Sequence, residues 1–145
     1  MPAFVQMEAF DLGKELVGFG QGAGAIVTFT GIVRNNAAGS LKEMLIEHYP
    51  AMTAPALNQI ETDARNRWEL NDCKIIHRFG ALKPGDQIMM VATASSHRKD
   101  AFEAAEFPMD YLKSRAPFWK KEITEQGESW VESKVQDEAE LERWQ

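Results

Sequence analysis

Apolar and polar residues alternate along much of this chain in short runs, and in three places apolar residues recur at the helical spacing of three or four. The short runs are rich in β-branched or aromatic residues and predict strands at 4–10, 25–33, 44–49, 73–82, 87–94, 118–123 and 129–135. The predicted helices are 11–19, 53–68 and 97–115. The order β-α-β-β-α-β-β-α-β-β favours an α+β domain with a mostly antiparallel sheet, helices on one side and a C-terminal β-hairpin.

Local signals predict where these elements end and how they pair. Thr53 is expected to cap the second helix, and strand 44–49 is expected to return as a hairpin against strand 25–33. The third helix should end near Arg115, because Pro117 disfavours helical geometry at the preceding residue. The residues predicted to face the core are Leu57, Ile60, Ala64 and Trp68 in the second helix and Phe102, Ala105, Met109 and Leu112 in the third.

The size and composition of the chain are those of one soluble domain covering residues 1–145. Apolar residues make up 44% and charged residues 26%, which is ordinary for a globular protein. No apolar run approaches the roughly 20 residues that span a bilayer, and the first residues lack a basic-then-apolar signal segment. We therefore expect a cytoplasmic protein that does not contact a membrane.

Cysteine, histidine and net charge limit the kinds of site that the chain can hold. Cys73 is the only cysteine and begins an apolar strand, so a buried structural thiol is favoured over a nucleophile. His48, His77 and His97 lack the spacing of a zinc site, and no metal or cofactor is expected. A net charge of -6 argues against a nucleic-acid-binding protein, which needs a broad basic face.

One segment of this acidic chain is strongly basic. Residues 111–121 contain Lys113, Arg115, Lys120 and Lys121 and no acidic residue. Lys113 lies near the end of a predicted helix and Lys120 near the start of a predicted strand, so the two could converge across the corner between them. Aromatic walls from Phe118 or Trp119 would partly desolvate an ammonium group there and lower its pKa toward the range useful for proton transfer. The alternative is a solvated helix end whose cations are favoured by the helix dipole.

Two further places could bind an anion. Arg34 follows the predicted central strand 25–33 directly, although a surface arginine at a loop mouth fits the same pattern. His97 and Arg98 follow two serines at the start of the third helix, where free backbone N–H groups, a hydroxyl and a cation meet. A plain serine cap is the alternative for this second place.

Six motifs, taken together and in this order, resemble those of one known family. They are Thr-Phe-Thr-Gly-Ile-Val-Arg-Asn (28–35), Glu-His-Tyr-Pro-Ala-Met (47–52), Ala-Arg-Asn-Arg-Trp (64–68), Ile-His-Arg-Phe-Gly (76–80), Ser-His-Arg (96–98) and Met-Asp-Tyr-Leu-Lys-Ser-Arg-Ala-Pro-Phe-Trp-Lys-Lys-Glu (109–122). The chain closely resembles the large, catalytic subunit of molybdopterin synthase over roughly residues 24–135. Each motif alone is weak, and the ordered set is specific.

The resemblance implies a sulfurtransferase of molybdenum cofactor biosynthesis. The family forms the dithiolene of molybdopterin from cyclic pyranopterin monophosphate. Both sulfur atoms come from a small ubiquitin-like partner that carries a C-terminal glycine thiocarboxylate. Large subunits form a homodimer with one small subunit at each end, which makes a heterotetramer.

The resemblance also assigns roles to residues of this chain. The essential lysine of the family falls on Lys113 and the second pocket lysine on Lys120. The contacts to the substrate anion fall on Arg34, His97 and Arg98, and the pocket edge falls on Lys121 and Glu122. Lys134 stands where an arginine often reaches the pocket of the neighbouring subunit, and lysine cannot offer the same bidentate fork.

Two other functions remain compatible with parts of the sequence. A non-catalytic module that binds a phosphorylated small molecule would need only positive charge at Lys113, whereas an enzyme needs a lysine that can titrate. A nucleic-acid-binding domain would use Phe118 and Trp119 for stacking, which the acidic remainder of the chain disfavours.

Overall fold

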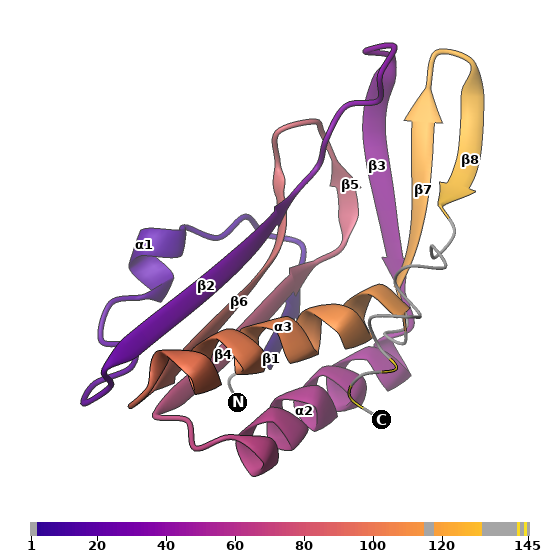
Figure 1. Ribbon diagram of the computed structural model, residues 1–145. Coiled ribbons are helices and arrows are strands. Elements are labelled where there is room, and N and C mark those ends of the chain that lie inside the picture. The colour runs from indigo at the N-terminus through magenta and orange to yellow at the C-terminus, as the bar shows by residue number, and fades with distance from the viewer. Residues whose placement is uncertain (1–2, 115–117, 132–141, 143, 145) are drawn as a thin grey trace.

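The fold is given by a computed structural model that describes residues 3–114, 118–131, 142 and 144. These residues form eight strands and three helices (Figure 1). The strands are β1 (Ala3–Gln6), β2 (Ala25–Ile32), β3 (Leu41–His48), β4 (Asp72–Arg78), β5 (Gly80–Leu82), β6 (Gln87–Ser95), β7 (Phe118–Thr124) and β8 (Gly127–Val131). The helices are α1 (Leu12–Glu15), α2 (Pro50–Arg67) and α3 (Arg98–Ser114).

The strands form two four-stranded sheets. The first sheet has the order β1-β4-β6-β2 and is antiparallel except for the β1–β4 pair. The second has the order β5-β3-β7-β8 and is antiparallel throughout. The long helices α2 and α3 lie side by side against the first sheet (Figure 1). The second sheet lies beyond the N-terminal end of α2 and the C-terminal end of α3. The mostly antiparallel α+β fold expected from the sequence is confirmed.

The predicted hairpin between strands 25–33 and 44–49 is wrong. β2 pairs with β6, and β3 pairs with β5 and β7, so the two strands belong to different sheets. The loop between them is held by its own side chains: Asn35 Oδ1 accepts from the Leu41 N–H at 3.1 Å, and Asn36 Oδ1 accepts from the Ser40 N–H at 2.9 Å. These amides satisfy two backbone N–H groups of the loop by which the chain crosses from one sheet to the other.

The predicted strand 73–82 is two strands. β4 ends at Arg78, and β5 begins at Gly80 and joins the second sheet. Gly80 has φ of 96°, a conformation that side-chain-bearing residues rarely adopt, so the glycine permits the change of direction. The predicted C-terminal β-hairpin, in contrast, is present: β7 pairs with β8, and Thr124 lies opposite Gly127 across Glu125 and Gln126.

Helix α2 begins three residues before the predicted cap. Pro50 occupies its first turn, where a missing N–H costs nothing. Thr53 lies inside the helix, fully buried, and its hydroxyl donates to the Tyr49 carbonyl at 2.7 Å. Leu57, Ile60 and Ala64 are buried as predicted.

Helix α3 ends at Ser114, close to the predicted end. Ala105 and Leu112 face the core as predicted, but Phe102 is 58% exposed and Phe107 is buried instead. Met109 packs against the core as predicted, so the difference lies in the first half of the helix, where Ala101 and Ala104 are buried in place of Phe102. Phe107 packs under Trp68 and Trp144, with ring centroids 5.5 and 5.6 Å away.

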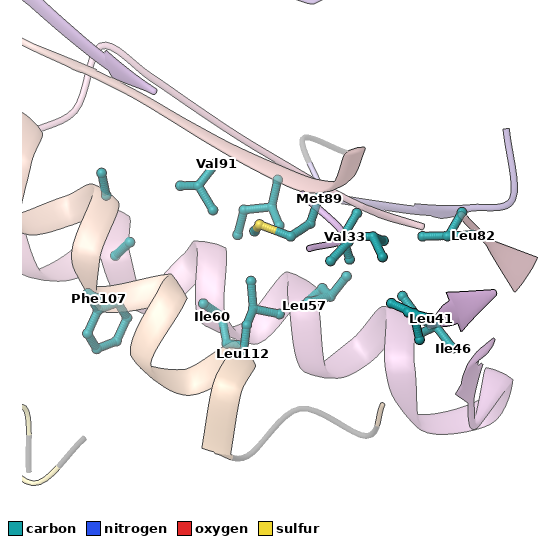
Figure 2. Close-up of a cluster of buried hydrophobic side chains, with 14 residues drawn as sticks. Val33, Leu41, Ile46, Leu57, Ile60, Leu82, Met89, Val91, Phe107 and Leu112 are labelled. Carbon is teal, nitrogen blue, oxygen red and sulfur yellow. The ribbon is translucent and has the colours of Figure 1, made fainter. Parts of the chain in front are cut away.

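One buried cluster joins both sheets to both long helices. Figure 2 shows it, with Leu57 and Leu112 from the helices and Val33, Ile46 and Val91 from or beside the strands. A smaller cluster on the opposite face of the first sheet includes Phe10, Phe19 and Met90, with Leu12 of α1 and Leu16 just after it packed against the cluster. No helix among the described residues has the length and apolarity needed to cross a membrane.

Candidate active site at the α3–β7 corner

Lys120 lies on the inner face of β7. The register pairs Lys120 with Ile46, which is 1% exposed, and pairs Phe118 with His48 on the same face. Because side chains alternate along a strand, Phe118, Lys120 and Glu122 share this face. Lys120 and Glu122 are half-buried. Of the two aromatic walls that the sequence offered, Phe118 is therefore the one on the side of Lys120.

Lys113 is the penultimate residue of α3. The preceding residue, Leu112, is 9% exposed and belongs to the large cluster. Helix α3 ends at Ser114 and β7 begins at Phe118, so Lys113 and Lys120 flank one corner of the chain. The side chain of Lys113 lies outside the described residues, as does Arg115.

Two histidines surround Phe118. The His77 ring on β4 stacks on the Phe118 ring with centroids 3.7 Å apart and an interplanar angle of 15°. The His48 ring lies 6.2 Å from Phe118 and 4.3 Å from Phe79. No sequence pattern indicated the stack, because its members come from distant strands of different sheets.

His77 is held neutral. Burial lowers its pKa to about 3, and electrostatic interactions with Lys120 and His48 act in the same direction. The one opposing influence is its hydrogen bond with the Arg78 carbonyl, at 2.8 Å from Nδ1. Since a carbonyl only accepts, Nδ1 carries the proton and Nε2 is the unprotonated nitrogen.

Arg34 lies at the same end of the molecule as the lysines. It is exposed, and the residue before it, Val33, belongs to the buried cluster that also contains Leu112 and Ile46. The Val33 backbone is tied to the turn before β6 by hydrogen bonds with Asp86 and Gly85 at 2.9 and 2.8 Å. These bonds fix the place where Arg34 leaves the sheet.

His97 and Arg98 lie elsewhere. Both are exposed at the start of α3, and the preceding Ser95 pairs with Ala25, at the opposite end of β2 from Arg34. With a rise of 1.5 Å per residue, Arg98 and Lys113 are separated by about 22 Å along α3. The structure therefore does not bring His97 and Arg98 together with Lys113, Lys120 and Arg34 in one chain.

Lys121 points to the outer face of β7. Its Nζ lies 4.7 Å from the centroid of the Trp130 ring and 3.8 Å from Glu128 Oε2. It is thus separated from Lys120 by the thickness of the sheet, whereas Glu122 shares the face of Lys120. Lys134 lies outside the described residues.

Cys73 is buried, as predicted for a structural thiol. Burial, with the nearby carboxylates of Glu61 and Asp72, raises the pKa of its thiol to about 12, although Arg65 acts in the opposite direction. A thiol with this pKa is protonated near neutral pH and is a poor nucleophile. Among the described residues, no group of three or more histidines, cysteines or carboxylates could hold a metal ion.

The chain matches a known protein family. The family model described as MoaE protein matches residues 5–115. The chain belongs to the MoaE family. Its MoaE relatives include the molybdopterin synthase catalytic subunit of Cereibacter sphaeroides, which is 57% identical over 147 residues and is covered in full by 99% of this chain.

Solved MoaE structures have the same fold. The molybdopterin biosynthesis MoaE protein of Burkholderia ambifaria has a TM-score of 0.82 and 46% identity, with 98% of this chain and 96% of that chain covered. A complex of subunits 1 and 2 of the molybdopterin-converting factor from Helicobacter pylori has a TM-score of 0.77 over 92% of each chain, and at 19% identity it supports the fold alone. These matches confirm the family expected from the motifs, and with it an enzyme of the molybdopterin synthase catalytic subunit family.

Proposed function

We propose that this chain transfers sulfur from the C-terminal glycine thiocarboxylate of a small ubiquitin-like partner to cyclic pyranopterin monophosphate, at a site built on Lys113 and Lys120. The observation that carries the proposal is the placement of both lysines at one corner, in a chain of the MoaE family. The half-buried position of Lys120 against the Phe118 side of β7 supports a partly desolvated site. A thiocarboxylate tail could approach this corner in an extended conformation.

The chemistry explains the need for cations. Attack by the thiocarboxylate on the pterin side chain, opening of the cyclic phosphate and loss of water all develop negative charge on oxygen. We assign to Lys113 the role of proton donor and acceptor at the reacting carbons and at the acyl carbonyl of the partner. Lys120 holds the thiocarboxylate or the intermediate that follows from it.

In this proposal the substrate anion is bound by Arg34, His97 and Arg98. These residues come from two copies of the chain: His97 and Arg98 from one copy, and Arg34, with Lys113, from the other. A site that uses all three with Lys113 cannot form in one chain, because α3 holds Arg98 about 22 Å from Lys113. In a homodimer with two-fold symmetry, the α3 start of one copy can face the α3–β7 corner of the other, and both sites are then completed at once. One small partner at each end of this dimer gives the heterotetramer.

The structure supports a place at the pocket edge for Glu122 better than for Lys121. Glu122 shares the inner face with Lys120, which fits a residue at the pocket edge. Lys121 would have to leave Trp130 and Glu128 to reach the same pocket, so we assign it a contact with the partner tail or the second copy instead of the inner pocket. Lys134 remains a candidate contact to the pocket of the second copy.

A reconstituted reaction tests the proposal. The purified chain is mixed with the thiocarboxylated partner and cyclic pyranopterin monophosphate, and molybdopterin is followed by the fluorescence of its oxidised form. We expect molybdopterin only when the partner carries the thiocarboxylate, and the partner with an ordinary C-terminal carboxylate is the control. Binding of the pterin phosphate without product, with a competent partner, would instead favour a non-catalytic binding module.

A further inference from the structure

His77 is a buried titratable residue beside the proposed site that the sulfur-transfer proposal leaves without a role. It is 3% exposed and lies on β4 of the first sheet, whereas its stacking partner Phe118 begins β7 of the second sheet. The stack therefore joins the two sheets at the corner where both proposed catalytic lysines stand. No other ring stacks face to face on Phe118 among the described residues.

Hydrogen bonds orient both imidazoles that neighbour Phe118. On one side, the hydrogen bond from His77 Nδ1–H to the Arg78 carbonyl sets the orientation of the imidazole. On the other side, His48 lies against Phe118, and its Nδ1 is 3.1 Å from the Thr53 hydroxyl. That hydroxyl already donates to Tyr49, so it accepts from His48 Nδ1–H. The Phe118 ring thus has two imidazole neighbours, and hydrogen bonds set the orientations of both.

The geometry of β7 links this stack to Lys120. Phe118 and Lys120 are two residues apart on one strand, and their side chains leave the same face. The charge of Lys120 is close enough to act on the His77 ring. Because Phe118 begins β7, contacts that hold its ring also hold the start of the strand from which the Lys120 side chain leaves.

We propose that His77 is a positioning residue for Lys120: its neutral ring, stacked on Phe118, holds the start of β7 so that the ammonium of Lys120 points into the site. This inference rests on the proposed function, since it assigns a supporting residue to a lysine of that site. A neutral aromatic ring suits the place because a second cation beside Lys120 would repel it. The role needs the shape of the ring, and not a proton transfer by the imidazole.

The test is a double-mutant cycle of His77→Leu and Lys120→Ala, measured in single turnover with saturating cyclic pterin and the thiocarboxylated partner in complex. We expect His77→Leu to lower the rate constant by about tenfold or more, as small misplacements of a catalytic group do. Substrate affinity should change little. In the Lys120→Ala background, His77→Leu should cause no further loss, because the group that it positions is gone.

Two further variants separate positioning from general damage to the fold. His77→Phe keeps a ring for the stack and should retain most of the rate, whereas Ile75→Val, which trims another buried side chain of β4, should leave it unchanged. If His77→Leu does not fold, Phe118→Leu removes the other half of the stack and enters the same cycle.

The outcomes distinguish the two proposals. Losses that multiply in the double variant, or a His77→Phe rate as low as that of His77→Leu, would overturn the positioning role alone. If the parent protein gave no product, or if Lys120→Ala kept the full rate, the proposed role of Lys120 would fail and this inference with it.

Discussion

Arg98 and Lys113 stand at opposite ends of α3, so one rigid helix keeps the proposed anion-binding residue away from the proposed catalytic lysine of the same chain. An α-helix of this length does not bend enough to bring its ends together. If both residues serve one substrate, they must come from two copies. This relationship gives the proposed homodimer a direct test.

We expect Lys113→Ala and Arg98→Ala to complement each other in a mixed dimer. In a dimer with one copy of each variant, one site carries both changes and the other carries neither. Purified mixed dimers should therefore show about half of the parent activity, as the symmetry of a two-fold dimer requires. The measurement is molybdopterin formation by mixed dimers isolated with two different affinity tags.

Each variant alone is the control for complementation, and each should be strongly impaired. Mixed dimers no more active than the pure variants would show that both residues act within one chain. An unimpaired Arg98→Ala protein would show that Arg98 has no part in the site. A dimer of two parent chains carrying the two tags sets the reference activity.

Cys73 should make stability fall at alkaline pH. An unfolded thiol ionises near pH 8.5, whereas the folded thiol has a pKa of about 12, so the native state binds more protons between these values. Stability from this group is present below about pH 8.5 and is lost, by up to about 1.4 kcal/mol per pH unit, as the pH rises toward 12. Urea unfolding of the parent and of Cys73→Ala at several pH values measures it.

The Cys73→Ala protein should lack this slope while keeping its catalytic activity, since the thiol is buried and protonated. An equal alkaline slope in both proteins would contradict the burial account. Loss of activity in a stably folded Cys73→Ala protein would give the thiol a role that the structure does not support.

His77 should act in the opposite pH range. Unfolded histidine binds a proton below about pH 6.5, whereas the buried ring stays neutral to far lower pH. The unfolded state then binds more protons, so the stability contributed by His77 is present above pH 6.5 and is lost as the pH falls below it. The stability difference between the parent and His77→Phe, measured by urea unfolding from pH 7 to pH 4.5, should change accordingly; a constant difference would contradict a neutral buried His77.

Trp144 should stabilise the packing of α2 and α3. Its ring contacts those of Trp68 and Phe107, its Nε1 donates to Asp110 Oδ2, and its carbonyl accepts from Arg67. We expect Trp144→Ala to lower the free energy of unfolding by about 2 to 4 kcal/mol. Trp130→Ala is the matched control: Trp130 is 52% exposed on β8, and its loss should cost less than about 1 kcal/mol. Equal losses in both variants would contradict the packing role of Trp144.

Local sequence patterns predicted the helices and strands better than they predicted which strands pair with each other. The end of helix α3 followed from Pro117, and the β7–β8 hairpin followed from two short runs of strand-forming residues, because each of these signals acts within a few residues. The separation of β2 from β3 did not, because pairing is decided by contacts among distant strands. The division of 73–82 at Gly80 required a single residue with positive φ to be recognised inside an otherwise continuous apolar run.

The candidate site was predicted in part for the same reason. Lys113 and Lys120 flank a corner that the sequence marks with a proline and a change of period. The separation of Arg98 from Lys113 also follows from helix length, but only the structure shows that Arg34 lies at the lysine end. The stack of His77 on Phe118 has no local signal, since its partners are distant in sequence and meet where two sheets join.

The most direct test of the account is a comparison of the parent, Lys113→Ala and Lys113→Arg in single-turnover sulfur transfer from the thiocarboxylated partner. General acid-base participation is typically worth about 10² to 10⁴ in rate, so Lys113→Ala should lose at least a hundredfold while it still folds and binds the partner. Lys113→Arg should fail as well, because arginine keeps the charge but does not give up its proton. Near-parent turnover by Lys113→Ala would contradict the central claim, and near-parent turnover by Lys113→Arg alone would reduce Lys113 to a purely electrostatic role.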